Sequence, residues 1–538
     1  MIKNIQTKYI FVLGGVMSGL GKGIAAASIG YLLKQAGVRV TILKLDPYLN
    51  VDPGTMNPYQ HGEVFVLDDG SETDLDLGHY ERFIDVNMTK NNNATAGQVF
   101  SRVLEKERKG EYLGETVQVI PHVTDEIKER IQLVNQNNEY EVIICEVGGT
   151  VGDIESLPFM ESIRQLSLEV GYHNHMLVHV TLLPFVKASG ELKSKPTQHS
   201  VMKLREIGLS PDMILCRSEL PIEQAVRDKI ALFCNVPSNH VIEGRDVSSI
   251  YEVPLAIYKQ NAGQLIKDRL KIRKTPQLGT LKKFIKNYKN PKYKVTIAMC
   301  GKYTELIDSY KSVMEAFVHA GVENNARVNI KWIQTEKIKN YKDVKDVFSN
   351  ANGVLILPGF GSRGSEGKIK IIKYSREKMV PFLGICLGLQ CAIIEFARNV
   401  CNLEGANSTE FNAKTRYPVI DLMESQRAIK IKGGTMRLGA YDCEIKVGTR
   451  TYAAYREEKI SERHRHRYEF NNKYEKILEK NGLIFSGFNR ELGLVETIEI
   501  KNHPWFIASQ FHPELKSRVN KAHPLFREFV HAAVKNSL

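Results

Sequence analysis

Cysteine is scarce in this sequence, and its spacing fits neither a disulfide scaffold nor a zinc site. The 538 residues include 8 cysteines, and no two of them form a CxxC pair. Disulfide scaffolds are short and dense in cysteine, and structural zinc sites draw on closely spaced cysteine or histidine pairs. The spacing argues against both classes. Scattered thiols are typical of a reducing compartment, so we expect a cytoplasmic protein.

Long hydrophobic runs are also missing. A membrane-spanning helix needs about 20 consecutive apolar residues, and no stretch of this chain approaches that length. The opening string MIKNIQTKYIFVLGG lacks the ordered regions of a secretory signal. We therefore expect neither a membrane span nor secretion. Hydrophobic residues make up 43% and charged residues 25%, which is ordinary for a globular protein, and the length predicts more than one domain.

The positive charge is unevenly distributed. The net charge is +13, and residues 267–294 alone hold eleven Lys or Arg against one Asp. Charge runs of this kind usually mark exposed segments, so an exposed linker is one interpretation and a contact site for an acidic partner is the other. No nucleic-acid-binding motif with aromatic platforms accompanies the basic residues, and we expect no nucleic-acid partner.

Apolar, β-rich runs alternate with helical stretches in two sets. The first set lies at 9–15, 38–46, 140–149, 175–185 and 212–218, and the second at 293–303, 353–361, 380–388 and 505–514. Continuous apolar strands separated by helices indicate parallel sheets covered on both faces. The sequence therefore predicts an α/β protein with domains at 1–269 and 293–538, joined by a basic linker at 270–292.

A glycine-rich string in the first half predicts a phosphate site. FVLGGVMSGLGKGIAAASIGYLLKQAG reads as a strand, a glycine loop and a helix whose N-terminus attracts phosphate. Lys22 adds a point charge, but Gly23 follows it where the ordinary P-loop has the Ser or Thr that meets magnesium. Glu146 at a strand end, with Asp74 and Asp76, supplies acids that MgATP chemistry needs, although each could also cap a turn.

A cysteine stands at a sharp bend in the second half. In FLGICLGLQCAIIEFA, Cys386 lies between glycines where an apolar strand meets a helix, as a nucleophile elbow would. The string QFHPE offers His512 as a base and Glu514 as its orienting group, on one face of the preceding strand if the strand continues. His464 and His466 are alternative bases, although their arginine-rich setting disfavours protonation. A buried structural cysteine is the competing interpretation.

Several strings carry a family resemblance. PGFG, GICLGLQ and QFHPE together resemble the class I glutamine amidotransferases. KLDPYLNVDPGTMNP, HGEVFVLDDGSETDLDLGHYERF, GGTVGDIESLPF and SGELKSKPTQHS resemble the CTP synthase family, in order along nearly the whole chain. The resemblance implies a P-loop-like and Rossmann-like synthetase domain followed by a class I glutamine amidotransferase domain.

The resemblance also implies a reaction. ATP would phosphorylate the 4-oxygen of UTP, and ammonia would then displace the phosphate to give CTP. The ammonia would come from glutamine hydrolysis in the C-terminal domain and reach the synthetase site through an internal passage. GTP would activate the enzyme and CTP would inhibit it. A homotetramer built from two dimers, with filaments as a higher assembly, is the quaternary structure that the family suggests.

Site residues follow from the same resemblance. The predicted catalytic residues are Cys386, His512 and Glu514. ATP would be held by Ser18, Gly19, Leu20, Gly21, Lys22, Gly23, Lys44, Asp76, Arg245, Asp246 and Val247, and Mg²⁺ by Asp76 and Glu146. UTP or CTP would be bound by Ser18, Asp153, Ile154, Glu155, Lys193, Ser194, Lys195, Pro196, Thr197, Gln198 and Lys229. Glutamine would be held by Gly359, Leu387, Gly388, Leu389, Gln390, Glu410 and Arg467.

Three details of these assignments depend on local geometry. Lys193 and Lys195 would lie on one side of an extended strand and suit a triphosphate. The N–H groups of Gly359 and Leu387 would stabilise the oxyanion. Residues 433–439 are a candidate contributor to the GTP site. The chain departs from the family twice, with Gly19 in place of a second serine and PGFG in place of PGGFG.

Two other functions are compatible with parts of the pattern. One is an ATP-dependent synthetase that amidates a carboxylate with the same two modules, which the KSKPTQHS string argues against. The other is a non-catalytic nucleotide-binding scaffold with a decayed glutaminase, which only the shortened PGFG turn favours. Formation of CTP from UTP, ATP and ammonium separates CTP synthesis from both.

Overall fold

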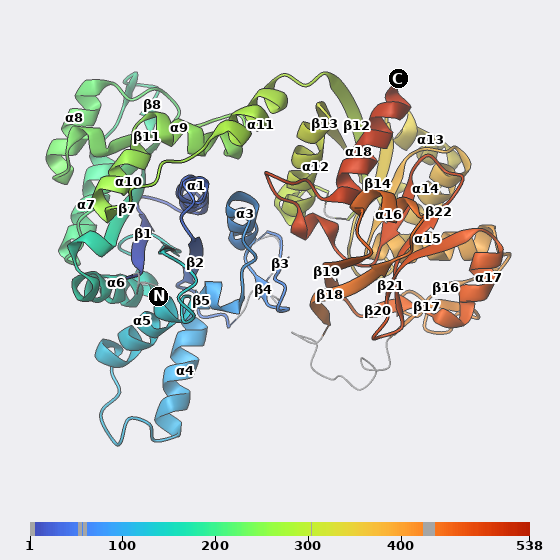
Figure 1. The fold of residues 1–538 in the computed structure, drawn as a ribbon, viewed down its shortest axis with the longest axis horizontal. Coiled ribbons are helices and arrows are strands. Elements are labelled where there is room, and N and C mark those ends of the chain that lie inside the picture. The colour runs from blue at the N-terminus through green and yellow to red at the C-terminus, as the bar shows by residue number, and fades with distance from the viewer. Residues whose placement is uncertain (1–5, 52–55, 57–61, 303, 423–435) are drawn as a thin grey trace. The chain divides into compact units, whose positions relative to one another are not determined.

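The computed structural model describes residues 6–51, 56, 62–302, 304–422 and 436–538 (Figure 1). The chain divides into two compact units, one formed by residues 1–53 and 76–285 and the other by residues 54–75 and 286–538. A short segment from the N-terminal half of the sequence therefore packs with the unit built from the C-terminal half. Each unit is described by itself, and the limits 1–269 and 293–538 remain predictions.

The first unit contains a parallel sheet of seven strands in the order β11-β10-β7-β1-β6-β2-β5. All of the apolar runs predicted in this half coincide with strands, and the predicted α/β class is confirmed. The strands are β1 (Lys8–Gly14), β2 (Val40–Asp46), β5 (Asn93–Thr95), β6 (Val142–Val147), β7 (His175–Leu182), β10 (Met213–Ser218) and β11 (Val241–Arg245). The hairpin β8 (Phe185–Val186) and β9 (Glu191–Leu192) is separate.

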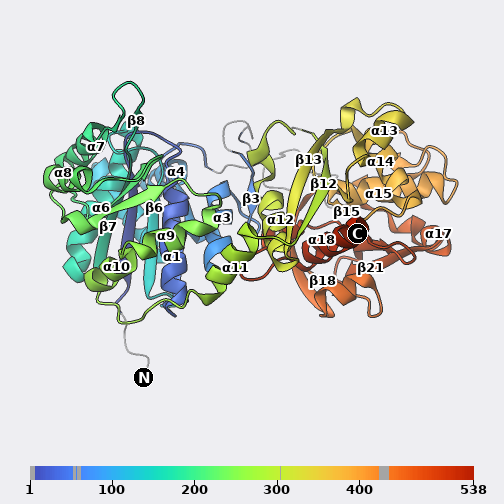
Figure 2. The same ribbon diagram turned by 90° about the horizontal axis from the view of Figure 1, so that it is seen from above.

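Helices cover both faces of this sheet (Figure 2). Helices α4, α5, α6 and α7 bury their apolar sides against one face, and α1, α9 and α10 lie on the other. The helices are α1 (Lys22–Gln35), α3 (Leu75–Ile84), α4 (Ala96–Arg108), α5 (Thr124–Leu133), α6 (Leu157–Val170), α7 (Lys195–Glu206), α8 (Gln224–Cys234), α9 (Val253–Lys259), α10 (Ala262–Leu270) and α11 (Gly279–Lys289).

Part of the basic segment is a helix with a buried side. Helix α11 buries Leu281, Phe284 and Ile285, and the Phe284 ring packs edge-on against Tyr251 with centroids 5.2 Å apart. Its lysines occupy the remaining surface, the usual arrangement of an amphipathic helix. The lysines of α11 are thus exposed as expected, but the helix that carries them is anchored by apolar side chains, and Arg269 earlier in the basic segment is largely buried in an ion pair with Asp212.

The second unit contains a mixed sheet of nine strands in the order β13-β12-β14-β15-β23-β22-β21-β18-β19. The strands from β13 to β23 are parallel, and the following pairs are antiparallel. They are β12 (Tyr293–Gly301), β13 (Ala326–Gln334), β14 (Gly353–Ile356), β15 (Phe382–Ile385), β18 (Arg437–Ile445), β19 (Lys459–His466), β21 (Leu483–Asn489), β22 (Leu494–Ile500) and β23 (Phe506–Ser509).

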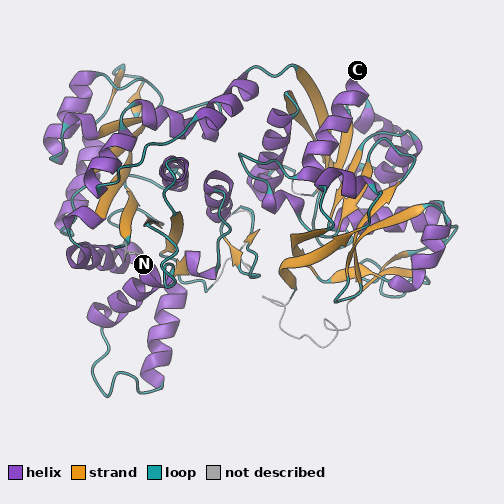
Figure 3. Cartoon of the chain, viewed as in Figure 1, coloured by secondary structure: helices purple, strands orange, loops and turns teal. Residues whose placement is uncertain are grey.

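Two smaller sheets complete this unit. One consists of β16 (Asn407–Ser408), β17 (Pro418–Leu422) and β20 (Tyr468–Phe470), and the other is the hairpin of β3 (Phe65–Val66) and β4 (Glu72–Thr73). Helices α13 (Tyr341–Phe348), α14 (Ser365–Glu377) and α15 (Leu387–Asn399) pack on one face of the large sheet. Helices α12 (Lys311–Glu323) and α18 (Pro524–Ser537) pack on the other, and α16 (Arg450–Tyr455) and α17 (Glu475–Lys480) are short (Figure 3).

Every helix within the described residues is too short or too polar to traverse a lipid bilayer.

The position of the candidate nucleophile depends on tight packing inside the second unit. A Cβ on Gly384 in β15 would lie 2.9 Å from the Ala508 Cβ and 2.9 Å from the carbonyl carbon of Gly388. Real Cβ atoms are almost never this close to such atoms, so the glycine allows α15 to begin directly against β15.

Substituting this glycine should therefore destabilise the second unit. We expect Gly384→Ala to cost about 1–3 kcal/mol through overpacking, seen as a lower thermal melting temperature. Gly279→Ala is the matched control, because a Cβ at that position in α11 has no neighbour within 4 Å. Its melting temperature should equal that of the parent chain. Equal melting of the Gly384 variant and the parent would contradict the packing argument.

Candidate functional site

Cys386 lies on a strained bend between β15 and α15. Its backbone has φ 52° and ψ −101°, a conformation that non-glycine residues rarely adopt. Such strain costs about 1–3 kcal/mol and persists where surrounding contacts impose it. Here the Cys386 N–H donates to the Ser509 carbonyl at 2.7 Å, and α15 starts at the next residue. The predicted nucleophile elbow is present, and its thiol is 2% exposed.

His512 and Glu514 are paired, but not by strand geometry. Strand β23 ends at Ser509, and Glu514 lies in a 3-10 turn, Pro513–Lys516. The expectation that a continuing strand puts both side chains on one face is wrong. The turn instead brings His512 Nδ1 to 2.7 Å from Glu514 Oε1. The backbone N–H of His512 donates to the Arg463 carbonyl at 2.8 Å. The side chains of His512 and Glu514 are thus in contact, and the orienting role of Glu514 stays a prediction.

The charge state of His512 follows from its neighbours. Burial lowers its pKa, but attraction to the charges of Glu514 and Cys386 outweighs burial and raises the pKa to about 10. At neutral pH the ring is therefore an imidazolium, and it lies beside the Cys386 sulfur. The same imidazolium holds a proton that a leaving amine could accept.

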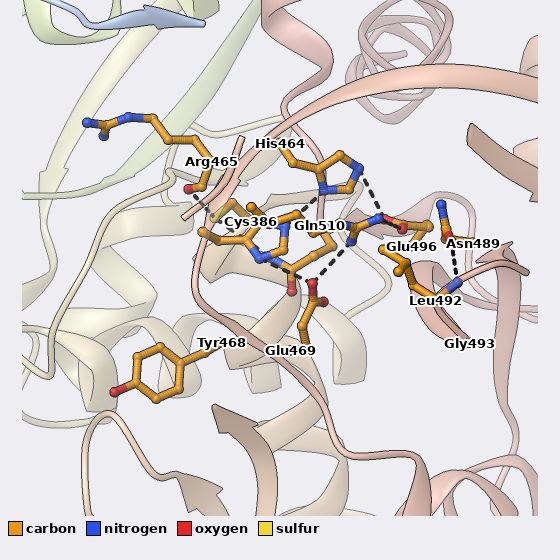
Figure 4. A network of polar contacts seen from close by, with 12 residues as sticks. Cys386, His464, Arg465, Tyr468, Glu469, Asn489, Leu492, Gly493, Glu496 and Gln510 are labelled. Carbon is orange, nitrogen blue, oxygen red and sulfur yellow. Dashed lines mark hydrogen bonds and ion pairs between the residues drawn. The ribbon is translucent and has the colours of Figure 1, made fainter. Parts of the chain in front are cut away.

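Two further groups contact the Cys386 sulfur. The Gln510 amide donates to Sγ at 3.8 Å, and the thiol faces the Arg465 carbonyl at 4.0 Å (Figure 4). Gln390, a predicted glutamine ligand, donates to the Gln510 side-chain oxygen at 3.4 Å and to the Tyr468 carbonyl at 3.0 Å. Sequence reasoning missed Gln510, although it begins the QFHPE string that supplied the base.

The shortened PGFG turn is held from two sides. The Lys302 ammonium donates to the carbonyl oxygens of Phe360 at 2.6 Å and Gly361 at 3.3 Å. The Glu410 carboxylate accepts the Gly361 N–H at 2.6 Å, and burial raises the pKa of Glu410. Lys302 was not predicted. Its signal is its position directly after a parallel strand, at the edge of the sheet where α/β proteins place their sites.

The predicted oxyanion and glutamine residues surround this turn. A Cβ on Gly359 would lie 3.8 Å from Cδ2 of Leu387, so the two residues predicted to supply the oxyanion N–H groups are neighbours in space. Gly388 and Leu389 follow in the first turn of α15. Arg467, partly buried, lies between β19 and β20. Leu387, Gly388, Leu389 and Gln390 thus directly follow Cys386 in α15, and Gly359 and Glu410 belong to or contact the PGFG turn. That these residues and Arg467 bind glutamine stays a prediction.

His464 and His466, the alternative bases, belong to a buried polar cluster, of which Figure 4 shows His464, Glu469 and Glu496. Arg437 bonds Glu469 at 3.1 Å and Glu496 at 2.6 Å, and the two histidines bond each other at 2.9 Å. Burial and the Arg437 charge lower the pKa of both histidines well below the usual value, which agrees with the expected disfavoured protonation. Of the candidate GTP segment, residues 433–435 lie outside the described residues.

The first unit holds a lysine between two predicted magnesium ligands. Lys44 Nζ donates to Asp76 at 2.6 Å and to Glu146 at 2.7 Å, with Asp46 at 3.9 Å, and Tyr80 also bonds Glu146. Burial opposes the charge of Lys44, but the acids outweigh it and raise its pKa well above the usual value. The same attraction overcomes burial and lowers the pKa of Asp76.

The residue that departs from the ordinary P-loop explains where Asp76 lies. A Cβ on Gly23 would be 2.4 Å from Asp76 Oδ1, so any side chain there would displace the carboxylate. An acid from α3 thus occupies the space that Ser or Thr fills in other P-loops. In the part of the chain that the structure describes, no cluster of three or more His, Cys, Asp or Glu side chains is arranged to hold a metal.

The glycine loop leads into a cavity. Gly19 and Gly21 have φ values of 73° and 82°, which glycine adopts readily, and α1 begins at Lys22. Lys22 Nζ donates to the Gly149 carbonyl at 2.6 Å, and burial lowers its pKa. Ser18 is an exposed residue of the same loop.

The cavity beside this loop has a volume of about 390 Å³. Its lining joins Leu20 and Gly21 to the three predicted adenine neighbours, Arg245, Asp246 and Val247. Arg217, which was not predicted, bridges the two sides: its guanidinium donates to the Gly19 carbonyl at 3.2 Å and to Asp246 at 3.1 Å. Five of the eleven predicted ATP residues, Leu20, Gly21, Arg245, Asp246 and Val247, therefore line one cavity.

The KSKPTQ segment differs from its expected shape. Strand β9 ends at Leu192 and α7 begins at Lys195, so the placement of Lys193 and Lys195 on one side of an extended strand is wrong. Lys193 pairs with Glu191, and Lys195 lies 5.9 Å from the Phe233 ring centroid. A helix forms because Pro196 fits its first turn.

The other predicted UTP or CTP residues fall into two groups. Ser194, Thr197 and Gln198 are buried, and Gln198 donates to the Ser194 hydroxyl at 3.0 Å. The remaining residues are exposed or partly exposed on loops and helices: Asp153, Ile154 and Glu155 precede α6, Pro196 opens α7, and Lys229 lies in α8. The protein itself holds the buried side chains in place, whereas the exposed side chains are available to contact a ligand.

Comparison with known proteins identifies the family. Residues 8–272 match the CTP synthase N-terminus family, and residues 305–532 match the class I glutamine amidotransferases. CTP synthase from Caldanaerobacter subterraneus is 58% identical, covering 98% of this chain and 98% of the relative. CTP synthase from Chlorobaculum tepidum is 55% identical, covering 99% and 95%. The solved Trypanosoma brucei CTPS glutaminase domain with bound acivicin is 34% identical, covering 45% of this chain and 94% of that one, with a TM-score of 0.43.

The full-length identities match what the strings in both halves of the sequence predicted, and the expected resemblance is confirmed. The fold classes of the two units agree with the two matched families. This chain belongs to the CTP synthase family.

Proposed function

We propose that the chain makes CTP by aminating UTP at the expense of ATP, with the residues described above in specific roles. The observation that carries the proposal is the presence of two complementary sites in one chain. One has a strained cysteine with a His512–Glu514 pair, and the other has a glycine loop with acids gathered around Lys44. The first suits release of ammonia from glutamine and the second suits phosphoryl transfer from ATP.

In the second unit, Cys386 would attack the side-chain amide carbon of glutamine. The oxyanion that forms would receive hydrogen bonds from the N–H groups of Gly359 and Leu387. His512 would give its proton to the departing nitrogen, which leaves as ammonia, and a thioester would remain on Cys386. Water would then hydrolyse the thioester, giving glutamate and the free thiol. Glu514 would keep His512 oriented throughout.

In the first unit, the γ-phosphate of ATP would be transferred to the 4-oxygen of UTP, leaving ADP. Ammonia would add to carbon 4, and inorganic phosphate would leave with that oxygen, giving CTP. Lys22 and the N-terminus of α1 suit the phosphates, and the cavity lined by Arg245, Asp246 and Val247 suits the base of ATP. Lys193 and Lys195 would attract the UTP triphosphate.

Magnesium is the cation that we propose for this site. Asp76 and Glu146 offer the carboxylate oxygens that Mg²⁺ prefers, and they already share one cation, the Lys44 ammonium. Bound magnesium would neutralise phosphate charge during transfer. We also propose GTP activation and CTP inhibition, and an assembly of four copies. Exposed apolar residues such as Leu104 (61%) and Leu113 (93%) support self-association, and the free state of all 8 cysteines supports a cytoplasmic location.

The division of labour predicts a specific loss in Cys386→Ala. Glutamine-dependent CTP formation should disappear, because no nucleophile remains, while CTP formation from added ammonia should persist. Cys391→Ala, a buried cysteine in the same helix, is the matched control and should keep both activities. Joint loss of both activities in the Cys386 variant, with the protein still folded, would refute separate sites.

The nucleotide site predicts the opposite pattern for Lys22→Ala. Both the ammonia-dependent and the glutamine-dependent reactions should fall, by about a hundredfold, because a charge aimed at the phosphates is lost. Lys34→Ala, in the last turn of the same helix, should behave as the parent chain. Ammonia-dependent synthesis that survives unchanged in the Lys22 variant would show that this loop does not bind ATP.

The raised pKa of His512 predicts a pH effect. The Glu514 charge helps to hold that pKa at about 10, so Glu514→Gln should lower it. The imidazolium, which exists below this pKa, would then be lost at a lower pH. We expect the alkaline limb of kcat/KM for glutamine hydrolysis to move to lower pH. Glu491→Gln, on an exposed turn, should leave the profile unchanged, and an unmoved limb in the Glu514 variant would contradict the assignment.

A further inference from the structure

Strand β19 supports the glutaminase site with its backbone. The carbonyl oxygen of Arg463 accepts the His512 N–H at 2.8 Å, and that of Arg465 faces the Cys386 thiol at 4.0 Å. Side chains two positions apart on a strand lie on the same side, so the two arginines point in one direction. A shift of these three residues of backbone would therefore move the surroundings of the nucleophile and of the base together.

The side chains of both arginines are held by acids from the β3–β4 hairpin, which is residues 65–73. Arg463 Nε donates to Asp68 at 2.5 Å, and Arg465 Nε donates to Glu72 at 2.8 Å. The Arg463 side chain is fully buried, so its charge requires this carboxylate. Arg465 also lies over the Phe360 ring of the PGFG turn, 5.5 Å from its centroid. One guanidinium thus contacts both the hairpin and the oxyanion turn.

The hairpin also lies directly against strand β18. The Ala440 N–H donates to the Asp68 carbonyl at 2.9 Å. A Cβ on Gly439 would be 2.6 Å from the Gly70 nitrogen, and Gly439 has φ 92°, so this position accepts little besides glycine. These contacts fix the hairpin in register with the sheet, so its two acids are presented to β19 from a defined position.

The hairpin continues directly into the candidate ATP site. Glu72 is the first residue of β4, and Asp76 follows it four residues later in the chain. The Asp76 carboxylate pairs with Lys44 in the first unit at 2.6 Å. A movement of Asp76 on nucleotide binding would pass to Glu72 through only three intervening residues, because a chain that short cannot absorb a large displacement.

We propose that Asp68 and Glu72 are positioning residues for glutamine hydrolysis, and that through Arg463 and Arg465 they make this hydrolysis respond to occupancy of the nucleotide site. The response to nucleotide rests on the proposed role of Asp76 in ATP binding. The acids touch no substrate. They act by holding the backbone and the oxyanion turn that surround Cys386 and His512.

The test measures glutamate release from glutamine by the full chain, with and without MgATP and UTP. Glu72→Gln and Asp68→Asn should lower kcat by about tenfold or more, with a smaller change in KM, because the reacting groups are misplaced while the glutamine ligands remain. We expect MgATP and UTP to stimulate glutamate release by the parent chain, and both variants should lose this stimulation. Ammonia-dependent CTP formation should stay at the parent level.

Asp69→Asn is the matched control, because it is the same change one residue along, on an exposed side chain that accepts the Ser71 N–H within the turn. It should behave as the parent chain. In a double-mutant cycle, Glu72→Gln combined with Arg465→Gln should lose little more than the worse single variant, since the pair acts as one unit. Melting temperatures identify any variant that fails to fold. If Asp68→Asn fails to fold, the kinetics of Glu72→Gln alone decide the proposal.

The outcomes separate the two levels of the proposal. Parent-like kcat and parent-like stimulation in folded Glu72→Gln would overturn it. Reduced kcat with intact stimulation would retain positioning and overturn the link to the nucleotide site. Failure of the proposed function would look different: the parent chain itself would form no CTP from ammonia, MgATP and UTP, while glutamate release would still measure positioning by the hairpin acids.

Discussion

The hydrogen bond from the backbone N–H of His512 to the Arg463 carbonyl, 2.8 Å long, determines where the candidate base lies in the second unit. Strand β23 ends at Ser509, three residues before His512, and the turn that carries Glu514 is too short to hold a position by itself. The backbone of β19 takes over that task. Because the same strand presents the Arg465 carbonyl to Cys386, one strand aligns the base with the nucleophile.

Apolar pattern was sufficient to predict the α/β class and the main parallel strands, because those strands are buried on both faces. It missed the short strands β5 and β11, the edge strand β13 and the antiparallel strands β18, β21 and β22. It also missed β19, whose sequence KISERHRH is too polar to indicate a buried strand. That strand is stable inside the protein because Arg463 is neutralised by Asp68, 395 residues away in the chain. A pairing over that separation leaves no local pattern.

The site residues show the same limit. The family strings identified the cysteine, its base and the acids near the glycine loop, and the two units assemble them. Lys302 and Gln510 were missed, since a lysine after a strand and a glutamine at the start of a motif have many ordinary explanations. Local geometry also failed where a strand ended early: a 3-10 turn pairs His512 with Glu514, and a helix begins at Lys195. The short PGFG turn is held by Lys302 and Glu410, so one missing glycine does not leave it unsupported.

The grouping of residues 54–75 with residues 286–538 has a practical consequence for dissecting this chain. A fragment that starts at residue 286 would contain Arg463 and Arg465 but neither of the carboxylates that bind them. Each guanidinium group would then lose an ion pair, and the backbone of β19 would lose the support that these pairs give. An isolated glutaminase would therefore have to include the hairpin, supplied as a fusion or as a separate peptide, to reproduce the native surroundings of the thiol.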